Sequence, residues 1–205
     1  MVDLIRKIHR LHRTFAKADL PHAFGGALAS AWCAGQARAT INIDVNVFVN
    51  GTDIERVLAA LPTQVRWTEA DVKVLKRDLQ CRLWFEHTPV DLFFNSTEWH
   101  EKLASRVIWE PLADVSLPFL CCEDLAVFKA LFNRTKDWSD LEAMQEAGSL
   151  DISRVSAAVI DLLALTRFVW RSYRRLGGSK RATDGMVLTE AWSLGTRPRT
   201  FGVRA

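Results

Sequence analysis

Hydrophobic positions recur along the chain with two different periods, and these periods predict which segments are helices and which are strands. Near the N-terminus, apolar residues recur every three to four positions, which predicts an amphipathic helix over about 3–18. Residues 43–49 alternate Ile and Val with mostly polar residues, which is typical of a strand. The same signal predicts shorter strands at 22–24, 80–86 and 90–94.

Helices follow the first strand and dominate the C-terminal third. The later segments predicted to be helical lie at about 27–33, 53–61, 122–133, 138–147 and 151–173. Residues 112–120 are expected to be irregular or weakly extended. This order predicts an α/β (α+β) fold, with a small mixed sheet flanked by helices and followed by a C-terminal helical subdomain. We place the α/β core at 1–118, the helical subdomain at 119–176 and a tail at 177–205.

Two adjacent glycines stand where the first short strand gives way to a helix. Gly25 and Gly26 carry no side chains, so backbone N–H groups there can approach an anion closely. The N-terminus of the following helix adds favourable positive charge. The pair therefore fits a phosphate-binding turn, although many glycine pairs at strand ends are only turns.

The polar residues of the strand at 43–49 offer a second element of a site. Residues two apart point to the same face of a strand, so Asn42, Asp44 and Asn46 share one face. Their oxygen atoms suit a hard cation such as magnesium. Asp91 lies within another predicted strand, and carboxylates from two adjacent strands can meet on one metal ion. The alternative is that these side chains simply face solvent.

These motifs together resemble the nucleotidyltransferase superfamily related to DNA polymerase β. That family carries a glycine pair, about a dozen residues, then Arg-x-Thr-x-Asp-x-Asp, with a third acid on a later strand. Here the Arg and Thr are Arg38 and Thr40, the second Asp is Asp44 and the third acid is Asp91. Asn42 stands where the family has its first Asp.

A second stretch, at 122–141, resembles the AbiEii/MenT-like group of bacterial toxin nucleotidyltransferases. It follows their Glu-Asp-Leu … Lys … Arg-x-Lys-Asp-x-x-Asp-Leu pattern. The resemblance implies that Lys129 lies near a triphosphate and that Asp137 completes the site. Lys129 has apolar sequence neighbours, where an ammonium group needs an anionic partner.

The resemblance implies a nucleotidyltransferase-type fold and a set of roles for these residues. The residues expected to be catalytic are Asp44, Lys129 and Asp137. Those expected to bind the substrate are Gly25, Gly26, Arg38, Thr40 and Arg134. Those expected to hold Mg2+ (or Mn2+) are Asp44, Asp91 and Asn42.

The implied reaction moves a nucleoside monophosphate from an NTP to a hydroxyl acceptor and releases pyrophosphate. For the toxin group the acceptor can be the 3′ end of tRNA, and an antitoxin protein is the expected partner. Two alternatives stay open, and Asn42 favours the first of them, because an amide brings no negative charge and should weaken a second metal ion. One is a catalytically degenerate nucleotide- or partner-binding protein. The other is an adenylyltransferase for a small molecule such as an antibiotic, and an acidic acceptor pocket would favour it for a cationic drug.

Charge and composition add expectations about partners and location. From Leu165 onward, nine basic residues stand against two acidic ones, a net charge of +7. This segment fits either an RNA contact or a solvated tail. No apolar run approaches the ~20 residues that cross a bilayer, and the N-terminus lacks a secretory signal, so we expect a cytoplasmic protein without membrane contact.

The four cysteines are Cys33, Cys81, Cys121 and Cys122, and none forms a C-x-x-C motif. In a cytoplasmic chain this spacing predicts no disulfide. The adjacent pair is interpreted as small hydrophobic residues at the start of a helix.

Overall fold

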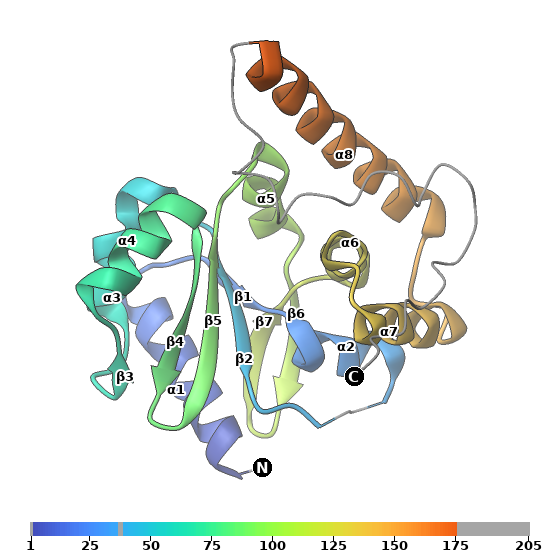
Figure 1. The fold of residues 1–205 in the computed structure, drawn as a ribbon. Coiled ribbons are helices and arrows are strands. Elements are labelled where there is room, and N and C mark those ends of the chain that lie inside the picture. Colours follow the sequence, from blue (N-terminus) through green and yellow to red (C-terminus); the bar gives the residue numbers. More distant parts are fainter. Residues whose placement is uncertain (1, 37–38, 176–205) are drawn as a thin grey trace, which may run out of the picture. The chain divides into compact units, whose positions relative to one another are not determined.

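The computed structural model describes residues 2–36 and 39–175, and its centre is a seven-stranded mixed sheet (Figure 1). The strands are β1 His22–Phe24, β2 Ile43–Val47, β3 Val65–Arg66, β4 Gln80–Phe85, β5 Thr88–Phe94, β6 Ile108–Leu112 and β7 Val115–Phe119. Their order in the sheet is β3-β4-β5-β2-β1-β7-β6. The predicted α/β fold with a mixed sheet is confirmed.

The central strands pair in a way that no local pattern specifies. β2 runs parallel to β5 on one side and antiparallel to β1 on the other, and β1 runs parallel to β7. The outer pairs β3–β4, β4–β5 and β6–β7 are antiparallel. The parallel β2–β5 pair places Asp44 directly beside Asp91.

The helices are mostly where periodicity predicted them. They are α1 Val2–Lys17, α2 Gly26–Ala34, α3 Ile54–Ala60, α4 Glu69–Asp78, α5 Glu98–Lys102, α6 Cys122–Phe132, α7 Thr135–Glu146 and α8 Ile152–Arg175, with short 3-10 turns at Gly51–Asp53 and Leu103–Arg106. Helices α2, α6 and α7 contact one another and are grouped together in Figure 1.

The core follows the predicted apolar stripes. Ile8, Leu11 and Phe15 of α1 are fully buried, as are Val45 and Val47 of β2. Complete burial of each such side chain stabilises the fold by about 1.5–3 kcal/mol. Among the described residues, those up to Val155 form one compact unit and those from Ser156 to Arg175 belong to a second. Helices α6 and α7 belong to the same unit as the sheet, and the domain division at 118 and 176 stays a prediction.

Two predictions of local structure were wrong or incomplete. Residues 108–119 form the β6–β7 hairpin, whereas 112–120 was expected to be irregular or only weakly extended. Pro111 and Pro118 interrupt the strand signal because proline has no N–H to donate to a ladder. Helix α4 was not predicted, although Thr68 and Asp71 form a capping box at its start, in which each side chain accepts the other's backbone N–H.

The prediction that the cysteines stay unpaired was also wrong. Cys33 of α2 and Cys122 of α6 form a disulfide, with 5.5 Å between their Cα atoms and 89 residues between them in sequence. The two cysteines meet because α2 and α6 pack together, which their spacing in the sequence does not reveal. Cys121 stays a free thiol, and burial raises its pKa to about 12, which keeps it protonated and unreactive.

The Cys33–Cys122 disulfide closes a long loop and so restricts the unfolded chain. Removing it is therefore expected to lower the free energy of unfolding by about 2–4 kcal/mol. Urea unfolding of the double variant Cys33→Ser/Cys122→Ser, compared with the oxidised chain, measures this difference. Cys81→Ser is the matched control, since Cys81 is a free thiol. An unfolding midpoint that is the same in the double variant and in the oxidised chain would argue against a stabilising role.

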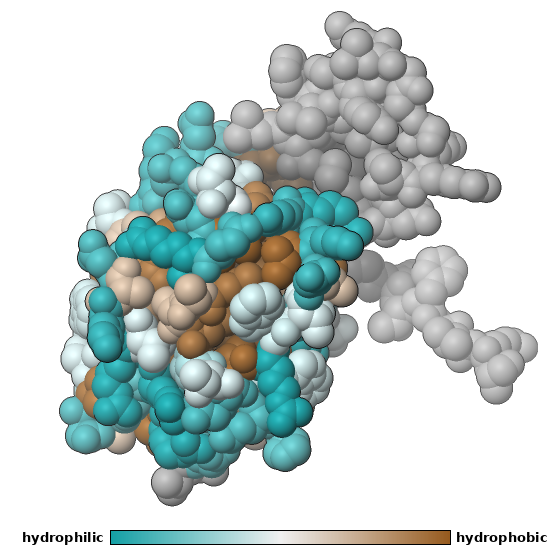
Figure 2. Space-filling model, turned by 90° about the vertical axis from the view of Figure 1, so that its left-hand side faces the viewer, coloured by the Kyte–Doolittle hydropathy of each residue, from teal (hydrophilic) through white to brown (hydrophobic). Residues whose placement is uncertain are grey.

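The surface of the described part mixes hydrophobic and hydrophilic areas. Figure 2 shows one side, on which hydrophobic residues gather in a central area bordered by hydrophilic ones. At the β3–β4 edge of the sheet, Trp67 and Trp84 are about half exposed. Of the helices in the described ranges, none combines the length and the apolar character that a membrane crossing requires.

Candidate active site

A cavity of about 630 Å³ opens over the polar face of the central strands. Residues of β2, β4 and β5, the start of α2, and helices α4, α6 and α7 line it. The predicted site residues found among its walls are Gly26, Asn42, Asp44, Asp91, Lys129, Arg134 and Asp137. Its volume lies within the range of small-molecule sites. The structure thus brings together residues that are far apart in the sequence.

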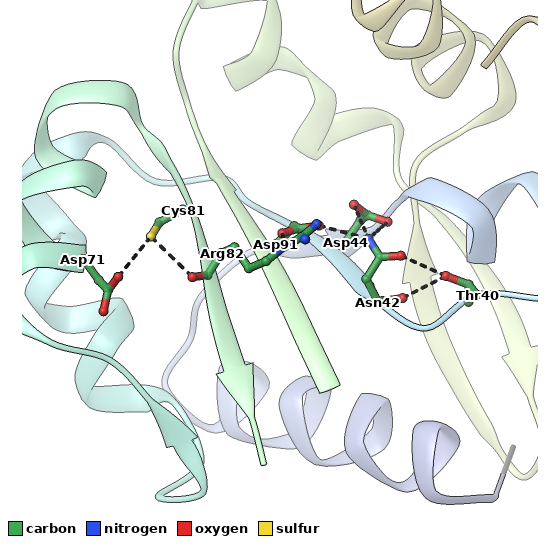
Figure 3. A network of polar contacts seen from close by, with 7 residues as sticks. All are labelled: Thr40, Asn42, Asp44, Asp71, Cys81, Arg82 and Asp91. Carbon is green, nitrogen blue, oxygen red and sulfur yellow. Dashed lines mark hydrogen bonds and ion pairs between the residues drawn. The ribbon is translucent and has the colours of Figure 1, made fainter. Parts of the chain in front are cut away.

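The two carboxylates expected to share a metal ion lie side by side. Asp44 and Asp91 are register partners on parallel strands. Asn42 Nδ2 lies between them and donates to Asp91 Oδ2 at 3.0 Å and to the Asp44 oxygens at 3.2 and 3.3 Å (Figure 3). The Thr40 hydroxyl donates to Asn42 Oδ1 at 3.0 Å, so Thr40 orders the loop and holds the amide in this orientation.

Asp44 is the most perturbed acid of this group. Burial and, to a smaller extent, the negative charge of Asp91 together raise the pKa of Asp44 to about 6. The positive charges of Lys136, Arg134 and Lys129 act in the opposite direction. A carboxyl group with a pKa near neutrality inside a cavity is typical of a functional site.

The glycine turn is fitted around the Asp44 carboxylate. Gly26 has a φ of +56°, and a Cβ atom at this position would lie 1.8 Å from Asp44 Oδ2. Only glycine combines this backbone angle with such a close approach. The Gly25 N–H donates to the Asp44 backbone carbonyl at 2.9 Å, so this group is already used within the turn. The backbone N–H groups that remain to bind a phosphate are those of Gly26 and of the first turn of α2.

Arg82 is a member of the site that the sequence analysis missed. Its guanidinium donates to Asp91 through two bonds, from Nε to Oδ1 at 2.7 Å and from Nη2 to Oδ2 at 2.9 Å (Figure 3). Arg82 and Asp91 are register partners in the antiparallel β4–β5 hairpin. The sequence analysis predicted strands at 80–86 and 90–94 but did not place the turn at 86–87, which sets the register that pairs these two residues.

The opposite wall of the cavity carries the basic residues of α6 and α7. Lys129 is buried, and its anionic partners are Asp140, with Nζ 2.5 Å from Oδ2, and Asp137 at 3.9 Å. Asp137 also accepts bonds from the Arg134 backbone N–H and side chain, which caps α7. Lys136 lines the cavity and forms no ion pair with any residue in the described ranges.

Asn46 shares the cavity-facing side of β2 with Asp44, as alternation predicted. Its Oδ1 lies 3.0 Å from His100 Nε2, and burial lowers the pKa of His100 to about 4. His100 is therefore neutral, and its Nε2–H donates to Asn46, which turns the Asn46 amino group away from His100. His100 was not recognised as a supporting residue in the sequence.

Other expectations fall outside the cavity or outside the described residues. The aromatic residues that line the cavity are Phe93, Phe128 and Phe132, and no tryptophan of the described ranges is among its walls. Arg38 lies outside the described residues. The basic segment from Leu165 onward lies outside the part of the chain whose side chains are described.

A mixed sheet that carries two adjacent carboxylates beside a glycine turn is the arrangement expected from the sequence, and the fold is of the nucleotidyltransferase type. Among solved structures, the chain is similar to the antibiotic-resistance factor ANT(2'')-Ia, with a TM-score of 0.55 and 15% identity over 85% of this chain and 98% of that one. It is also similar to an antigenic nucleotidyltransferase-like protein from Paracoccidioides brasiliensis, with a TM-score of 0.45 and 11% identity over 83% and 92% of the two chains. No protein-family model and no curated protein matches the chain. The toxin subgroup stays a prediction.

Proposed function

We propose that the chain is a nucleotidyltransferase that moves a nucleoside monophosphate from an NTP to a hydroxyl acceptor. The observation that carries this proposal is the Asp44–Asp91 pair, in register on adjacent strands and fitted against the Gly26 turn. The pair faces a cavity whose other wall presents basic side chains. Such a site can hold a triphosphate between a cation at the carboxylates and positive charge opposite.

The donor set fits one magnesium ion. Asp44 and Asp91 present carboxylate oxygens, which Mg2+ prefers. Asn42 presents its amino group to them, so its amide must rotate before its oxygen can serve as a ligand. Among the residues that the structure describes, no group of three or more His, Cys, Asp or Glu side chains is arranged to bind a metal. When bound, Mg2+ neutralises charge on the phosphates and lowers the barrier to transfer.

The residues of the chain supply binding and orientation. Lys136 is the basic cavity residue without an ion pair among the described residues, and we assign it to the triphosphate; Arg134 and Lys129 add positive charge from within their ion pairs. The acceptor oxygen forms a bond to the α-phosphorus while the bond from that phosphorus to the β-phosphate oxygen breaks. Pyrophosphate leaves, and the Asp44–Asp91 pair accepts the hydroxyl proton.

The charge of the cavity favours an RNA acceptor over a cationic drug. Its acidic residues are Asp44, Asp78, Asp91 and Asp137, and its basic residues are Arg82, Lys129, Arg134 and Lys136. Three of these acids already form ion pairs with arginines. The walls therefore offer no excess negative charge to a polycation. We propose a tRNA 3′ end as the acceptor and, with it, a toxin role that an antitoxin protein restrains.

Label transfer tests this proposal. The purified chain with Mg2+, one α-labelled NTP at a time and total tRNA is expected to label RNA and release pyrophosphate, and Asp44→Asn is expected to abolish both. Small hydroxyl compounds, including aminoglycosides, replace tRNA in parallel reactions. Label on a small compound but not on RNA would move the assignment to a small-molecule adenylyltransferase.

A catalytically inactive nucleotide-binding protein is the second candidate, and the Asn42 amino group between the two carboxylates favours it. In that case NTP binds, but neither pyrophosphate nor labelled product appears with any acceptor. Equilibrium dialysis with the same labelled NTPs separates this outcome from a chain that binds no nucleotide.

A further inference from the structure

We propose that Arg82 supplies the positive charge that a second divalent cation would otherwise provide, so that the site works with a single metal ion. This inference rests on the proposed function and adds to it the number of cations that the site takes. It concerns the network of Figure 3, which connects Thr40 and Asn42 through the two carboxylates to Arg82.

The geometry assigns one side of Asp91 to Arg82. Both Asp91 oxygens accept from the guanidinium, at 2.7 and 2.9 Å, in a fork that matches the carboxylate plane. Oδ2 also accepts from Asn42 Nδ2 at 3.0 Å. Asp91 is shielded from solvent, with 16% of its side chain exposed. A metal ion that approached from the β4 side would have to displace this bidentate pair.

The charges of the site lead to the same conclusion. The two carboxylates carry a charge of −2 and Arg82 adds +1, so one divalent cation already exceeds the remaining negative charge of these side chains. A second divalent ion would therefore lie near the guanidinium with no carboxylate to compensate its charge. Two positive charges that lie close together repel each other strongly. Asn42 adds no negative charge, whereas an Asp there would add one. Arg82 and Asn42 thus act in the same direction, each removing a reason for a second ion to bind.

Arg82 can serve the nucleotide from this position. It lines the cavity, and 56% of its side chain is exposed, so its outer N–H groups remain accessible beyond the bonds to Asp91. A guanidinium is planar and permanently charged, and it binds phosphate oxygens as well as carboxylates. A fixed arginine thus places positive charge beside the triphosphate at every stage of the reaction.

Manganese binding measures the number of ions directly. The chain is saturated with α,β-methylene analogues of the four NTPs, and bound Mn2+ is counted by electron paramagnetic resonance. We expect one Mn2+ per chain in the wild type and still one in Asn42→Asp, because Arg82 remains. We expect two in Asn42→Asp/Arg82→Gln, in which the third carboxylate is present and the guanidinium is gone. Arg66→Gln, an exposed arginine on β3 outside the cavity, is the matched control and should bind one.

Each contrary count overturns the inference. Two ions in the wild type or in Asn42→Asp would show that Arg82 does not exclude the second ion, and this result stands even if the double variant fails to fold. One ion in a folded double variant would show that Arg82 and Asn42 do not set the number. Two ions in a wild type that also transfers label would leave the proposed function intact. A chain that binds neither Mn2+ nor any analogue would overturn both proposals.

Discussion

Asp44→Asn is expected to raise the free energy of unfolding of the metal-free chain by up to about 3 kcal/mol at pH 8 while abolishing nucleotidyl transfer. The pKa of Asp44 is raised by burial and by Asp91, from its ordinary value of 3.8 to about 6. Each pKa unit corresponds to about 1.4 kcal/mol of free energy. The ionised carboxylate therefore destabilises the fold, and a neutral amide of the same shape removes that penalty.

The sign of the pH dependence follows from the direction of this shift. Because the folded-state pKa lies above the unfolded value, the contribution of Asp44 to stability is fully present below about pH 4 and is lost as the pH rises through about 6. The difference in stability between Asp44→Asn and the wild type should accordingly be small near pH 4 and largest above pH 7. The Asp44 carboxylate, to which we propose a catalytic role, is thus kept ionised at the expense of stability.

Urea unfolding in EDTA between pH 4.5 and 8 measures this difference. Asp114→Asn, an exposed residue in the β6–β7 turn, is the control and should show no such pH trend. Adding Mg2+ should stabilise the wild type at pH 8 and should stabilise Asp44→Asn much less, because the metal site that we propose at this carboxylate exists only in the folded chain. An Asp44→Asn variant that is no more stable than the wild type at pH 8 would contradict the assigned burial penalty.

The parts of the site that could be predicted are those set by local patterns. The alternation in 43–49 placed Asn42, Asp44 and Asn46 on one face, and the glycine pair marked the turn that lies against Asp44. These signals depend on residues within a few positions of one another. The pairing of β2 with β5 is different, because Asp44 and Asp91 meet only through the order of strands in the sheet. The sequence indicated that the two acids suit one metal, and the structure provides the register that makes them neighbours.

What could not be predicted depends on contacts between distant elements. The Cys33–Cys122 disulfide requires that α2 and α6 pack together, which neither helix signals by its own periodicity. The Arg82–Asp91 pair depends on the register of the β4–β5 hairpin. The motif taken from related sequences does not contain Arg82. Lys129 was expected to face an anion, and the structure adds that Asp140 already provides one. The motif residues therefore hold one another in place as well as facing the cavity.

Gly26→Ala is expected to lower kcat/KM for nucleotidyl transfer by about 100-fold or more and to lower the free energy of unfolding by about 2 kcal/mol. The added Cβ would lie 1.8 Å from Asp44 Oδ2 and 2.6 Å from its Cγ, so the carboxylate must rotate away from the turn. A displacement of about 1 Å in a reacting group can reduce the rate by about 100-fold. Alanine at a φ of +56° costs ~1–2 kcal/mol of backbone strain, which accounts for most of the expected loss of stability.

Two other glycines separate the effect on the carboxylate from the effect on the backbone. Gly35 and Gly148 also have positive φ values, of +64° and +70°, but nothing lies within 4 Å of a Cβ added at either position. Alanine at either position should lower the free energy of unfolding only by the cost of the strained backbone angle and should leave kcat/KM close to the wild-type value. Gly26→Ala should differ from both by losing activity and by binding Mn2+ more weakly, because the displaced Asp44 carboxylate is the ligand expected to hold the ion. If all three variants lost stability equally and kept full activity, the close approach of Gly26 to Asp44 would have no role in the site. A selective loss at Gly26 would tie the glycine pair to catalysis through the position of a single carboxylate.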